Sequence, residues 1–384
     1  MDADVAVIGL GTMGSMTIWQ LARKGISVLG FEQFGIGHDR SAYGGGSRRF
    51  RIASPLVEES LFIKESYPIF RELERETGQH FLSNSGSLTI GDPNSTRMKN
   101  VIKSAENNNL SYKILDTTEA KYHYPQHRLL PEEIIVWDQL GGVIRPEQTV
   151  ISAVNRAQSL GAKILSYSKV ENIQADSKGV TIETNNRTYR VGKVIVTAGA
   201  WANKLVPSLD KVFSVYRLIM SWFIPKNPEE FSEDNFPNFS RLSDGVSMQG
   251  TPALDGRMVR VTNSSETLSE AKQKVDNPDS FKKDVSLEYV VSVRESIARL
   301  IPNLNPEPVR ISTYIDGFTS DGFPIVGSLQ ESDNIILVCG FSAQGFSQAP
   351  AMGKIATDFV LKGRTNYQID HLSPNRFDVS TVRS

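Results

Sequence analysis

Apolar and polar positions at the start of the chain follow two different periods. The continuous apolar run Val5–Ile8 is typical of a buried strand. From Ser15 to Lys24 the apolar positions recur at helical spacing, and Gly25 follows as a stop signal. A second apolar run, Ser27–Phe31, predicts another buried strand. The pattern therefore predicts a strand–helix–strand unit, in which a helix joins two neighbouring parallel strands.

The same two periods predict further helices and strands along the rest of the chain. Helical spacing predicts helices over Pro55–Gly78 (kinked at Pro68), Asn94–Asn107, Arg145–Leu160, Ser286–Leu300 and Ser347–Leu361. Short apolar or alternating runs predict strands over Ser87–Ile90, Lys163–Tyr167, Val170–Ile173, Gly179–Thr184, Val191–Val196 and Ile335–Cys339. Two longer strands of a different sheet are expected over Phe213–Ile224 and Val246–Val261. The Pro-, Asn- and Glu-rich segment between these two strands is expected to be a loop.

Length, charge and cysteine content narrow the class of protein. A chain of 384 residues with 39% hydrophobic residues suggests about two domains with a large core. The 42 basic and 43 acidic residues nearly cancel, so global attraction to nucleic acid or to a membrane surface is not expected. A single cysteine, Cys339, allows no intramolecular disulfide. The start of the chain has no basic signal-peptide region, so a cytoplasmic enzyme is the expectation.

The turn after the first strand carries the sequence Gly9-Leu-Gly11-Thr-Met-Gly14, which is a G-x-G-x-x-G motif. Gly9 permits a tight turn, Gly11 lets backbone approach a pyrophosphate, and Gly14 lets the helix pack closely on the strand. The following helix N-terminus offers free N–H groups to phosphate. Glu32 ends the second strand, about 20 residues after the first glycine, where a carboxylate takes the ribose hydroxyls. Together these features predict dinucleotide binding, whereas an ordinary strand–turn–helix is the simpler alternative.

Two further stretches fit a dinucleotide site. The segment Gly44–Arg51 has three consecutive glycines followed by Arg48, Arg49 and Arg51, and we interpret it as a cofactor loop whose arginines face anions. A solvated basic turn is the alternative. Near the other end of the chain, the strand Ile335–Cys339 breaks into a glycine-bearing loop and then a helix. One extended cofactor touched from both ends of the sequence fits FAD better than NAD.

At these motifs the chain resembles the FAD-dependent amine oxidases of the D-amino-acid oxidase superfamily. The branch it is most similar to contains monomeric sarcosine oxidase and N-methyltryptophan oxidase, with bacterial fructosyl-amino-acid oxidases nearby. The resemblance covers nearly the whole chain. It rests on the first glycine motif with Glu32, on Gly46–Arg51, on Thr197–Trp201, on Asp321–Gly327 and on Gly340–Phe346.

The resemblance implies an α/β (α+β) fold with a Rossmann-like FAD-binding domain and an inserted substrate domain built on a mostly antiparallel sheet. The expected FAD-binding domain is discontinuous and comprises residues 1–84, 145–210 and 308–384, and the expected substrate domain comprises residues 85–144 and 211–307. The implied reaction is oxidation of a secondary amine, such as an N-methyl amino acid, to an imine, with O2 reduced to H2O2.

The resemblance also implies site residues. Arg48 matches an arginine over the flavin ring, and Arg51 matches the arginine that pairs with the substrate carboxylate. Arg260 and Tyr314 complete the expected catalytic set, and the expected substrate contacts are Arg51, Met248, Gln249, Tyr314 and Ser347. The expected cofactor contacts are Gly9, Gly11, Thr12, Met13, Gly14, Glu32, Gln33, Ser41, Ser47, Arg48, Val170, Ala198, Gly199, Trp201, Gly340, Phe341, Gln344, Gly345, Phe346 and Ser347.

Four positions depart from the family pattern. Ser312 stands where the family has the cysteine that bonds to the flavin, so we expect non-covalent FAD, with Cys339 as a core residue. Arg260 stands where the family has a lysine that promotes oxygen reduction. Ser347 replaces a carboxylate-binding lysine, and Met248 or Gln249 replaces an active-site tyrosine. We therefore expect a substrate other than plain sarcosine, namely a larger or differently charged amine.

Other functions stay open at this point. The same fold could act on fructosyl amino acids, could work as an amine dehydrogenase with another electron acceptor, or could bind flavin without turnover. An NAD-dependent dehydrogenase does not explain the glycine-bearing segments near the C-terminus. The five histidines form no metal-ligand spacing, so no metal is expected. The expected partners are a small amine or amino-acid-like substrate and O2, with neither nucleic acid nor membrane, in a monomer or small homo-oligomer.

Overall fold

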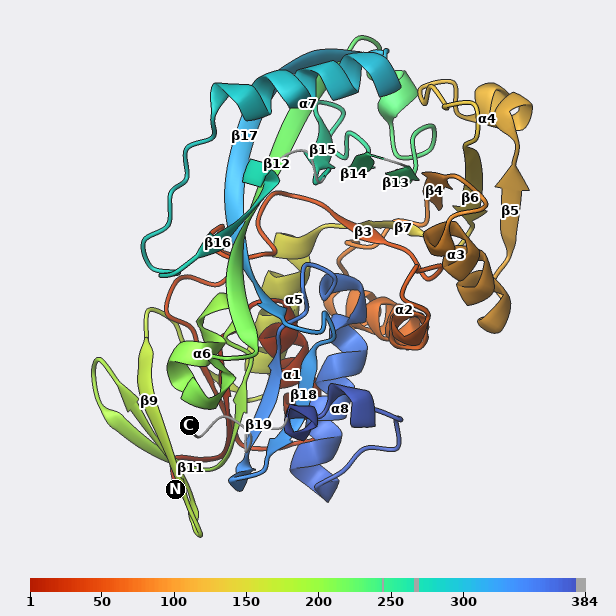
Figure 1. Ribbon diagram of the computed structural model, residues 1–384. Coiled ribbons are helices and arrows are strands. Elements are labelled where there is room, and N and C mark those ends of the chain that lie inside the picture. Colours follow the sequence, from red (N-terminus) through yellow and green to blue (C-terminus); the bar gives the residue numbers. More distant parts are fainter. Residues whose placement is uncertain (244, 266–268, 378–384) are drawn as a thin grey trace.

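The structure is a computed structural model that describes residues 1–243, 245–265 and 269–377. Its described residues form two large sheets with helices around them (Figure 1). The helices are α1 (Thr12–Arg23), α2 (Val57–Thr77), α3 (Thr96–Asn107), α4 (Thr117–His123), α5 (Pro146–Ser159), α6 (Ala202–Leu205), α7 (Leu287–Leu300) and α8 (Ala349–Lys362). Short 3-10 turns lie at η1 (Gly199–Trp201), η2 (Pro207–Leu209), η3 (Glu229–Phe231), η4 (Ser269–Ala271), η5 (Phe346–Gln348), η6 (Asp370–Leu372) and η7 (Pro374–Arg376).

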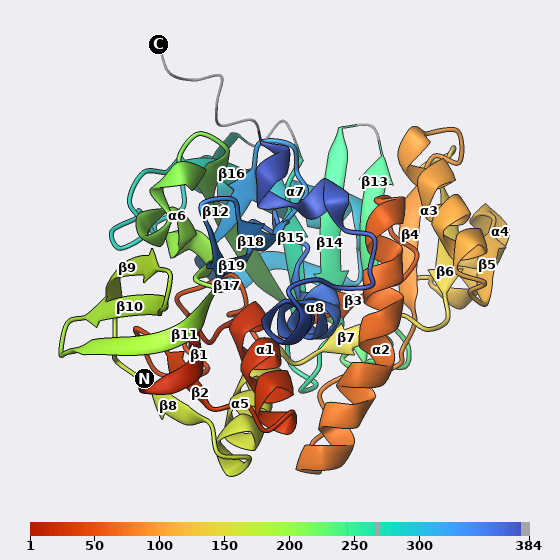
Figure 2. The ribbon, with the colours of Figure 1, turned by 90° about the horizontal axis from the view of Figure 1, so that it is seen from below.

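The first sheet has a parallel centre in the strand order β18-β19-β11-β1-β2-β8, with β10 and β9 added in antiparallel fashion beside β11. Its strands are β1 (Ala3–Ile8), β2 (Val28–Phe31), β8 (Lys163–Leu165), β9 (Val170–Asp176), β10 (Gly179–Thr184), β11 (Thr188–Val196), β18 (Ile325–Leu329) and β19 (Ser332–Cys339). Helices α1, α5 and α8 pack on one face of this sheet, and α8 lies beside α1 (Figure 2). Because β1, β2, β11 and β19 are parallel, their carboxyl ends meet at one edge.

The second sheet is mostly antiparallel, in the order β16-β12-β15-β14-β13-β4-β6-β5, with β17 also paired to β12. Its strands are β4 (Ser87–Gly91), β5 (Tyr112–Leu115), β6 (Ile134–Asp138), β12 (Phe213–Pro225), β13 (Asn238–Ser243), β14 (Val246–Thr251), β15 (Val259–Asn263), β16 (Lys272–Val275) and β17 (Leu304–Thr319). Helix α7 covers its outer face (Figure 1) and packs there through Tyr289, Val293 and Ile297. A two-stranded ribbon of β3 (Arg48–Phe50) and β7 (Gly142–Ile144) lies beside it.

This architecture confirms the predicted α/β fold with a Rossmann-like unit and a second, mostly antiparallel sheet. The predicted strand–helix–strand start is β1–α1–β2. The division into two domains stays a prediction. The expected boundary at residue 308 falls inside β17, which is hydrogen-bonded to β12 along most of its length.

Two predictions in the second sheet were wrong. The expected single strand Val246–Val261 is two antiparallel strands, β14 and β15, because the chain reverses through the turn around Gly256. The expected loop before it contains β13, which pairs with both β4 and β14. A buried side chain explains β13: the amide of Asn238 donates to the carbonyl oxygens of Gly86 and Gly142 at 3.0 and 2.7 Å.

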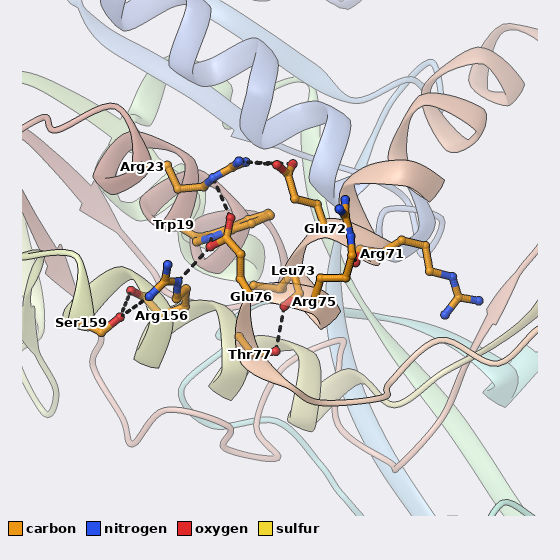
Figure 3. A network of polar contacts seen from close by, with 10 residues as sticks. All are labelled: Trp19, Arg23, Arg71, Glu72, Leu73, Arg75, Glu76, Thr77, Arg156 and Ser159. Atoms are coloured by element: carbon orange, nitrogen blue, oxygen red, sulfur yellow. Dashed lines mark hydrogen bonds and ion pairs between the residues drawn. The ribbon is translucent and has the colours of Figure 1, made fainter.

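A charged network joins α1, α2 and α5 on the outside of the first sheet (Figure 3). Glu76 accepts hydrogen bonds from Arg156 Nε at 2.9 Å and from Trp19 Nε1 at 3.2 Å. The same carboxylate lies 3.0 Å from Arg23 Nε. Burial alone would raise the pKa of Glu76, but the bonds from Arg156 and Trp19 and the charge of Arg23 outweigh it and lower the pKa. The network therefore fixes the three helices relative to one another.

Candidate functional site

The turn between β1 and α1 leaves a helix N-terminus open. Gly9 has φ +90° and lies so close to β11 that a Cβ would meet the carbonyl oxygen of Thr197 at 2.8 Å. A Cβ on Gly14 would meet the carbonyl oxygen of Gly9 at 1.9 Å, so only glycine permits this helix–turn packing. The first turn of α1 has no side-chain cap and no acidic residue. Its N–H groups and positive dipole end are suited to a phosphate.

Glu32 lies at the end of β2 beside this turn and is 5% exposed. Its carboxylate accepts hydrogen bonds from the backbone N–H groups of Leu10 and Phe34, both at 3.0 Å. Burial raises the pKa of Glu32, although the backbone hydrogen bonds partly oppose this. The carboxylate thus braces the glycine turn and also lines the cavity described below.

A second turn approaches from the other end of the chain. β19 ends at Cys339, and Gly340, Ser342 and Ala343 adopt positive φ before η5 and α8 begin. Asp316 of β17 accepts a hydrogen bond from the Ala343 N–H at 2.9 Å and so holds the loop. Burial raises the pKa of Asp316 to about 6, because desolvation outweighs its backbone hydrogen bonds. The loop therefore presents the N-terminal end of η5 and α8 to the same region as the first turn.

These turns border one cavity of about 960 Å³ between the two sheets. Residues from both ends of the sequence line it, including Gly11 and Gly345, together with Ala198 from the end of β11. Its volume is in the upper part of the range for small-molecule sites, which is roughly 300–1,000 Å³. The donor set fits an extended dinucleotide, because an uncapped helix N-terminus, a buried carboxylate and a second helix start share one continuous space.

Arg48 is held by the glycine loop that precedes it. Its guanidinium donates to the carbonyl oxygens of Ser47 and Gly44, each at 2.6 Å, and to that of Ala42. The loop is fixed in turn by Glu147, which accepts hydrogen bonds from the N–H groups of Gly45 and Gly46 at 2.8 and 3.0 Å. Arg48 lines the cavity in this arrangement.

Arg260 on β15 is 3% exposed and lies under the same loop. Its Nε donates to Ser47 Oγ at 3.0 Å and its Nη1 to Thr262 Oγ1 at 3.3 Å. The pKa of Arg260 is lowered to about 9, mainly by burial and to a smaller extent by the positive charge of Arg48. Arg260 therefore places a desolvated cation on the second sheet, facing the cavity that it lines.

A polar corner of the cavity is formed by Arg49, Arg51, Gln249 and Ser347. Arg49 Nη2 donates to Gln249 Oε1, and Ser347 Oγ donates to the backbone oxygen of Arg49 at 2.9 Å. Glu59 on α2 also lines this corner, and burial raises its pKa to about 7 although the charge of Arg51 opposes the shift. The corner carries more cations than carboxylates and is suited to an anionic group.

The structure brings most of the predicted site residues to the cavity. Among the described residues, the predicted residues that line it are Gly9, Gly11, Thr12, Met13, Glu32, Gln33, Ser41, Arg48, Arg51, Val170, Ala198, Gly199, Trp201, Met248, Gln249, Arg260, Gly340, Phe341, Gln344, Gly345, Phe346 and Ser347. Gly14 and Ser47 lie just behind the lining, where Gly14 permits the helix packing and Ser47 bonds Arg260 and Thr251.

Tyr314 is the predicted site residue that the structure places elsewhere. It is 2% exposed and packs with Met220 and Trp222 beneath Gly44 and Gly45. A Cβ on Gly44 would lie 2.4 Å from the Tyr314 ring, so the glycine loop covers the ring. The structure therefore gives Tyr314 a supporting position behind the loop and not a place in the cavity lining.

Arg49 and Glu59 line the cavity although the sequence did not single them out as site residues. Arg49 was expected only as one cation of the loop, and its place between Arg48 and Arg51 was the available signal. Glu59 carried no signal, because an acidic residue early in an amphipathic helix is ordinary. The structure also holds no cluster of three or more His, Cys, Asp or Glu side chains suited to a metal, among the residues it describes.

The parallel sheet with its glycine turn, the antiparallel sheet opposite it and the cavity of about 960 Å³ between them have the architecture of a dinucleotide-binding enzyme. Residues 4–359 match the FAD-dependent oxidoreductase family, DAO, and the chain belongs to this family. It is an FAD-dependent oxidoreductase.

Curated relatives cover nearly the whole chain. The chain is 30% identical over 379 residues to a monomeric sarcosine oxidase of Streptomyces avermitilis, with 97% of each protein covered. It is 25% identical over 380 residues to an N-methyl-L-tryptophan oxidase of Salmonella dublin, with 98% of this chain and 100% of the relative covered. These relatives confirm the resemblance inferred from the motifs.

Solved structures support the same fold. NikD, described as an unusual amino acid oxidase essential for nikkomycin biosynthesis, is 21% identical, with a TM-score of 0.85 over 97% of each chain. The L-proline dehydrogenase of P. horikoshii gives the same identity and TM-score over 98% of each chain. At this identity the likeness shows the fold alone. Within the described part of the chain, no helix is both long and apolar enough to cross a membrane.

Proposed function

We propose that this protein oxidises the secondary amine of an N-alkyl amino acid to an imine and passes the electrons to O2, which becomes H2O2. The observation that carries this proposal is the polar corner with its two cations, Arg49 and Arg51, in a cavity whose other end fits a dinucleotide. The curated relatives named above support the substrate class, since they are named for sarcosine and N-methyl-L-tryptophan.

When bound, FAD supplies the two-electron acceptor for a hydride from the carbon next to the amine nitrogen. The residues of the chain would hold and orient the substrate. Arg51 pairs with the substrate carboxylate, and a bidentate guanidinium–carboxylate pair fixes both position and orientation. The second sheet forms the opposite wall of the cavity, and the burial of Arg260 there strengthens the charge interactions of its guanidinium. The amine nitrogen loses a proton as the hydride leaves, and water then hydrolyses the imine.

The chain's own residues also provide positive potential. The N-terminal end of η5 and α8 lies at the Gly345–Phe346 end of the cavity and would favour negative charge there. Arg260 adds a buried cation on the opposite side. Arg260 stands where the resemblance implies a lysine, so a dehydrogenase that uses another acceptor is the second candidate. Peroxide formation in air separates the two candidates.

We further propose that FAD is held without a covalent bond. The hydroxyl of Ser312 accepts a hydrogen bond from Arg310 Nε at 3.3 Å, and a serine cannot form a thioether. Cys339 is 2% exposed in β19, and burial raises the pKa of its thiol to about 12, which disfavours the reactive thiolate.

The test of the function is anaerobic mixing of the holoenzyme with N-methyl amino acids, fructosyl amino acids and the corresponding primary amino acids. We expect secondary amines to bleach the flavin absorbance and primary amines to act more slowly. Arg51→Met should raise the KM for N-methyl-L-alanine about 10- to 100-fold, because a charge-assisted pair is lost. The matched control Arg75→Met removes an exposed arginine of α2 outside the cavity lining and should leave the KM unchanged. Flavin that no amine reduces would refute the proposed function.

A further inference from the structure

Two guanidinium groups beside the cavity each have a nitrogen without a partner. Arg49 and Arg51 both line the cavity. In each of them Nη1 is buried and finds no hydrogen-bond partner among the described residues. A buried cationic donor without an acceptor is destabilising, and an anionic ligand group removes that penalty. The structure thus offers two separate donors for anionic groups of a ligand.

Arg51 has carboxylates near it. The charges of Glu59 and Asp138 favour its protonated form, although burial lowers its pKa. Negative charge within the protein therefore lies near Arg51 before any substrate binds.

Arg49 has a different environment. Burial lowers its pKa well below the ordinary value, and the charged neighbours that add to this shift, Arg51 and Arg260, are both cations. Its Nη2 is bound to Gln249 Oε1, which is a neutral acceptor. The side chain therefore places an uncompensated positive charge at the cavity.

The position of Arg49 is fixed on three sides. Its backbone pairs with Val143 in the β3–β7 ribbon. Its carbonyl oxygen accepts from Ser347 Oγ at 2.9 Å, and its guanidinium is held by Gln249 of β14. A guanidinium held in this way loses little further entropy when it binds a planar anion. The arrangement is therefore a preorganised site and not a loose surface arginine.

We propose that Arg49 and Gln249 form a second anion subsite, and that the substrate is an N-alkyl amino acid that carries a second carboxylate. The inference rests on the proposed function, in which Arg51 takes the first carboxylate. Arg49 then takes the second one through its guanidinium, while Gln249 holds the plane of that group. A substrate with a neutral side chain leaves Arg49 without an anion.

Matched pairs of an acid and its amide test the inference with almost no change in substrate shape. The holoenzyme is assayed with N-methyl-L-glutamate against N-methyl-L-glutamine and with N-methyl-L-aspartate against N-methyl-L-asparagine. Iminodiacetate against sarcosine is a third pair, in which the second carboxylate is absent from the smaller substrate. For at least one pair we expect the substrate with the second carboxylate to have a kcat/KM about 10- to 100-fold higher than the substrate without it. The reason is that only the former makes the charge-assisted pair with Arg49. The difference should lie mainly in KM.

Variants of Arg49 separate recognition from structural support. Arg49→Met should reduce the acid-to-amide ratio to about one, whereas Arg49→Lys should keep part of it, since lysine retains the charge but not the fork. Arg75→Met should keep the wild-type ratio. FAD content and thermal unfolding are measured for each variant, and the ratio for the wild-type protein stands even if Arg49→Met does not fold.

Two results would overturn the inference. The first is a wild-type protein that oxidises N-methyl amino acids but shows no preference for any acid over its amide. The second is an Arg49→Met protein in which the rates for acid and amide fall by the same factor, because a purely structural role moves both equally. A protein whose flavin no secondary amine reduces fails at the proposed function itself, and this inference then falls with it.

Discussion

Replacement of Gly14 by alanine tests the glycine turn on which the cofactor site depends. The new Cβ would lie 1.9 Å from the carbonyl oxygen of Gly9 and 2.7 Å from Thr197 Oγ1. Since Cβ contacts below 3.0 Å are essentially never seen, the start of α1 must move by about 1.1 Å relative to the turn. Overpacking of this kind destabilises a fold by about 1–3 kcal/mol.

The same movement displaces the uncapped N–H groups at the start of α1. A displacement of about 1.1 Å takes a donor out of hydrogen-bonding range of a phosphate oxygen, since such bonds are about 2.7–3.2 Å long. Loss of one bond to a charged group weakens binding by about 1.5–3 kcal/mol, or roughly 10- to 150-fold in the dissociation constant. We therefore expect Gly14→Ala to lower both the free energy of unfolding and the affinity for FAD.

Gly353→Ala is the matched control, because Gly353 is also a helical glycine in close contact with α1. A Cβ there would lie 2.8 Å from the backbone carbon of Met16, and Gly353 does not line the cavity. We expect this variant to lose stability but to keep its affinity for FAD. The assay is a titration of apoprotein with FAD, followed by flavin fluorescence, together with thermal unfolding. A Gly14→Ala protein that binds FAD as tightly as wild type would refute the role of the turn.

The remaining predictions concern charged groups. Glu76→Gln should lower the free energy of unfolding by about 1 kcal/mol at neutral pH. Because the folded-state pKa of Glu76 is depressed, the difference between the two proteins should shrink progressively as pH falls below the ordinary glutamate value of about 4.3. A difference in thermal melts that is as large at pH 3 as at pH 7 would contradict this. The pKa of Glu59 is raised to about 7, so above that pH its ionised carboxylate adds a negative charge beside Arg51. In the wild-type protein the KM for a substrate carboxylate should therefore rise above pH 7, whereas in Glu59→Gln it should not change with pH in this range. Because the pKa of Glu59 is higher in the folded than in the unfolded protein, the wild-type protein loses stability as pH rises from the unfolded pKa of this group to above 7. Glu59→Gln should therefore be more stable than wild type at pH 8 and as stable as wild type at pH 4, which calorimetry measures. Arg260→Met should slow reoxidation of the reduced enzyme by O2 about 100-fold in stopped-flow measurements, whereas Arg260→Lys should retain most of the rate. Equal reoxidation rates for wild type and Arg260→Met would exclude a role for this cation.

The elements that could be predicted from the sequence are those whose burial pattern is local. The apolar run of β1 is buried along almost its whole length, and α1 is buried on all sides between its neighbours. Helices α5 and α7 bury one face each. In all four the local pattern of apolar residues is enough to predict the element. The glycine motif also predicted that the start of α1 borders a ligand cavity, because Gly9 and Gly14 permit the close packing that leaves this end of the helix uncapped beside the lining.

The strand β13 could not be predicted, because its burial depends on distant residues. Asn238 is fully buried only because the carbonyl oxygens of Gly86 and Gly142 accept from its amide. Arg241 is 1% exposed because Glu133, far away in the sequence, pairs with it. A polar strand stabilised by such pairing has the local pattern of a loop.

The candidate site shows the same limit. Residues in motifs, such as Arg48 and Arg51, could be placed at the cavity because their neighbours in the sequence form the cofactor loop. Tyr314 could not, because its position depends on how the glycine loop folds over β17. The unpartnered Nη1 of Arg49 is likewise a property of the assembled corner and not of any local stretch.

The most direct test of the account is the amount of FAD that the purified protein holds and its release on denaturation. We predict one FAD per chain, which passes into the filtrate when the protein is denatured and ultrafiltered. Gly14→Ala, purified in the same way, should retain less flavin than Gly353→Ala. A fully reconstituted wild-type protein without flavin would contradict the cofactor site, and flavin retained with the denatured chain would contradict non-covalent binding.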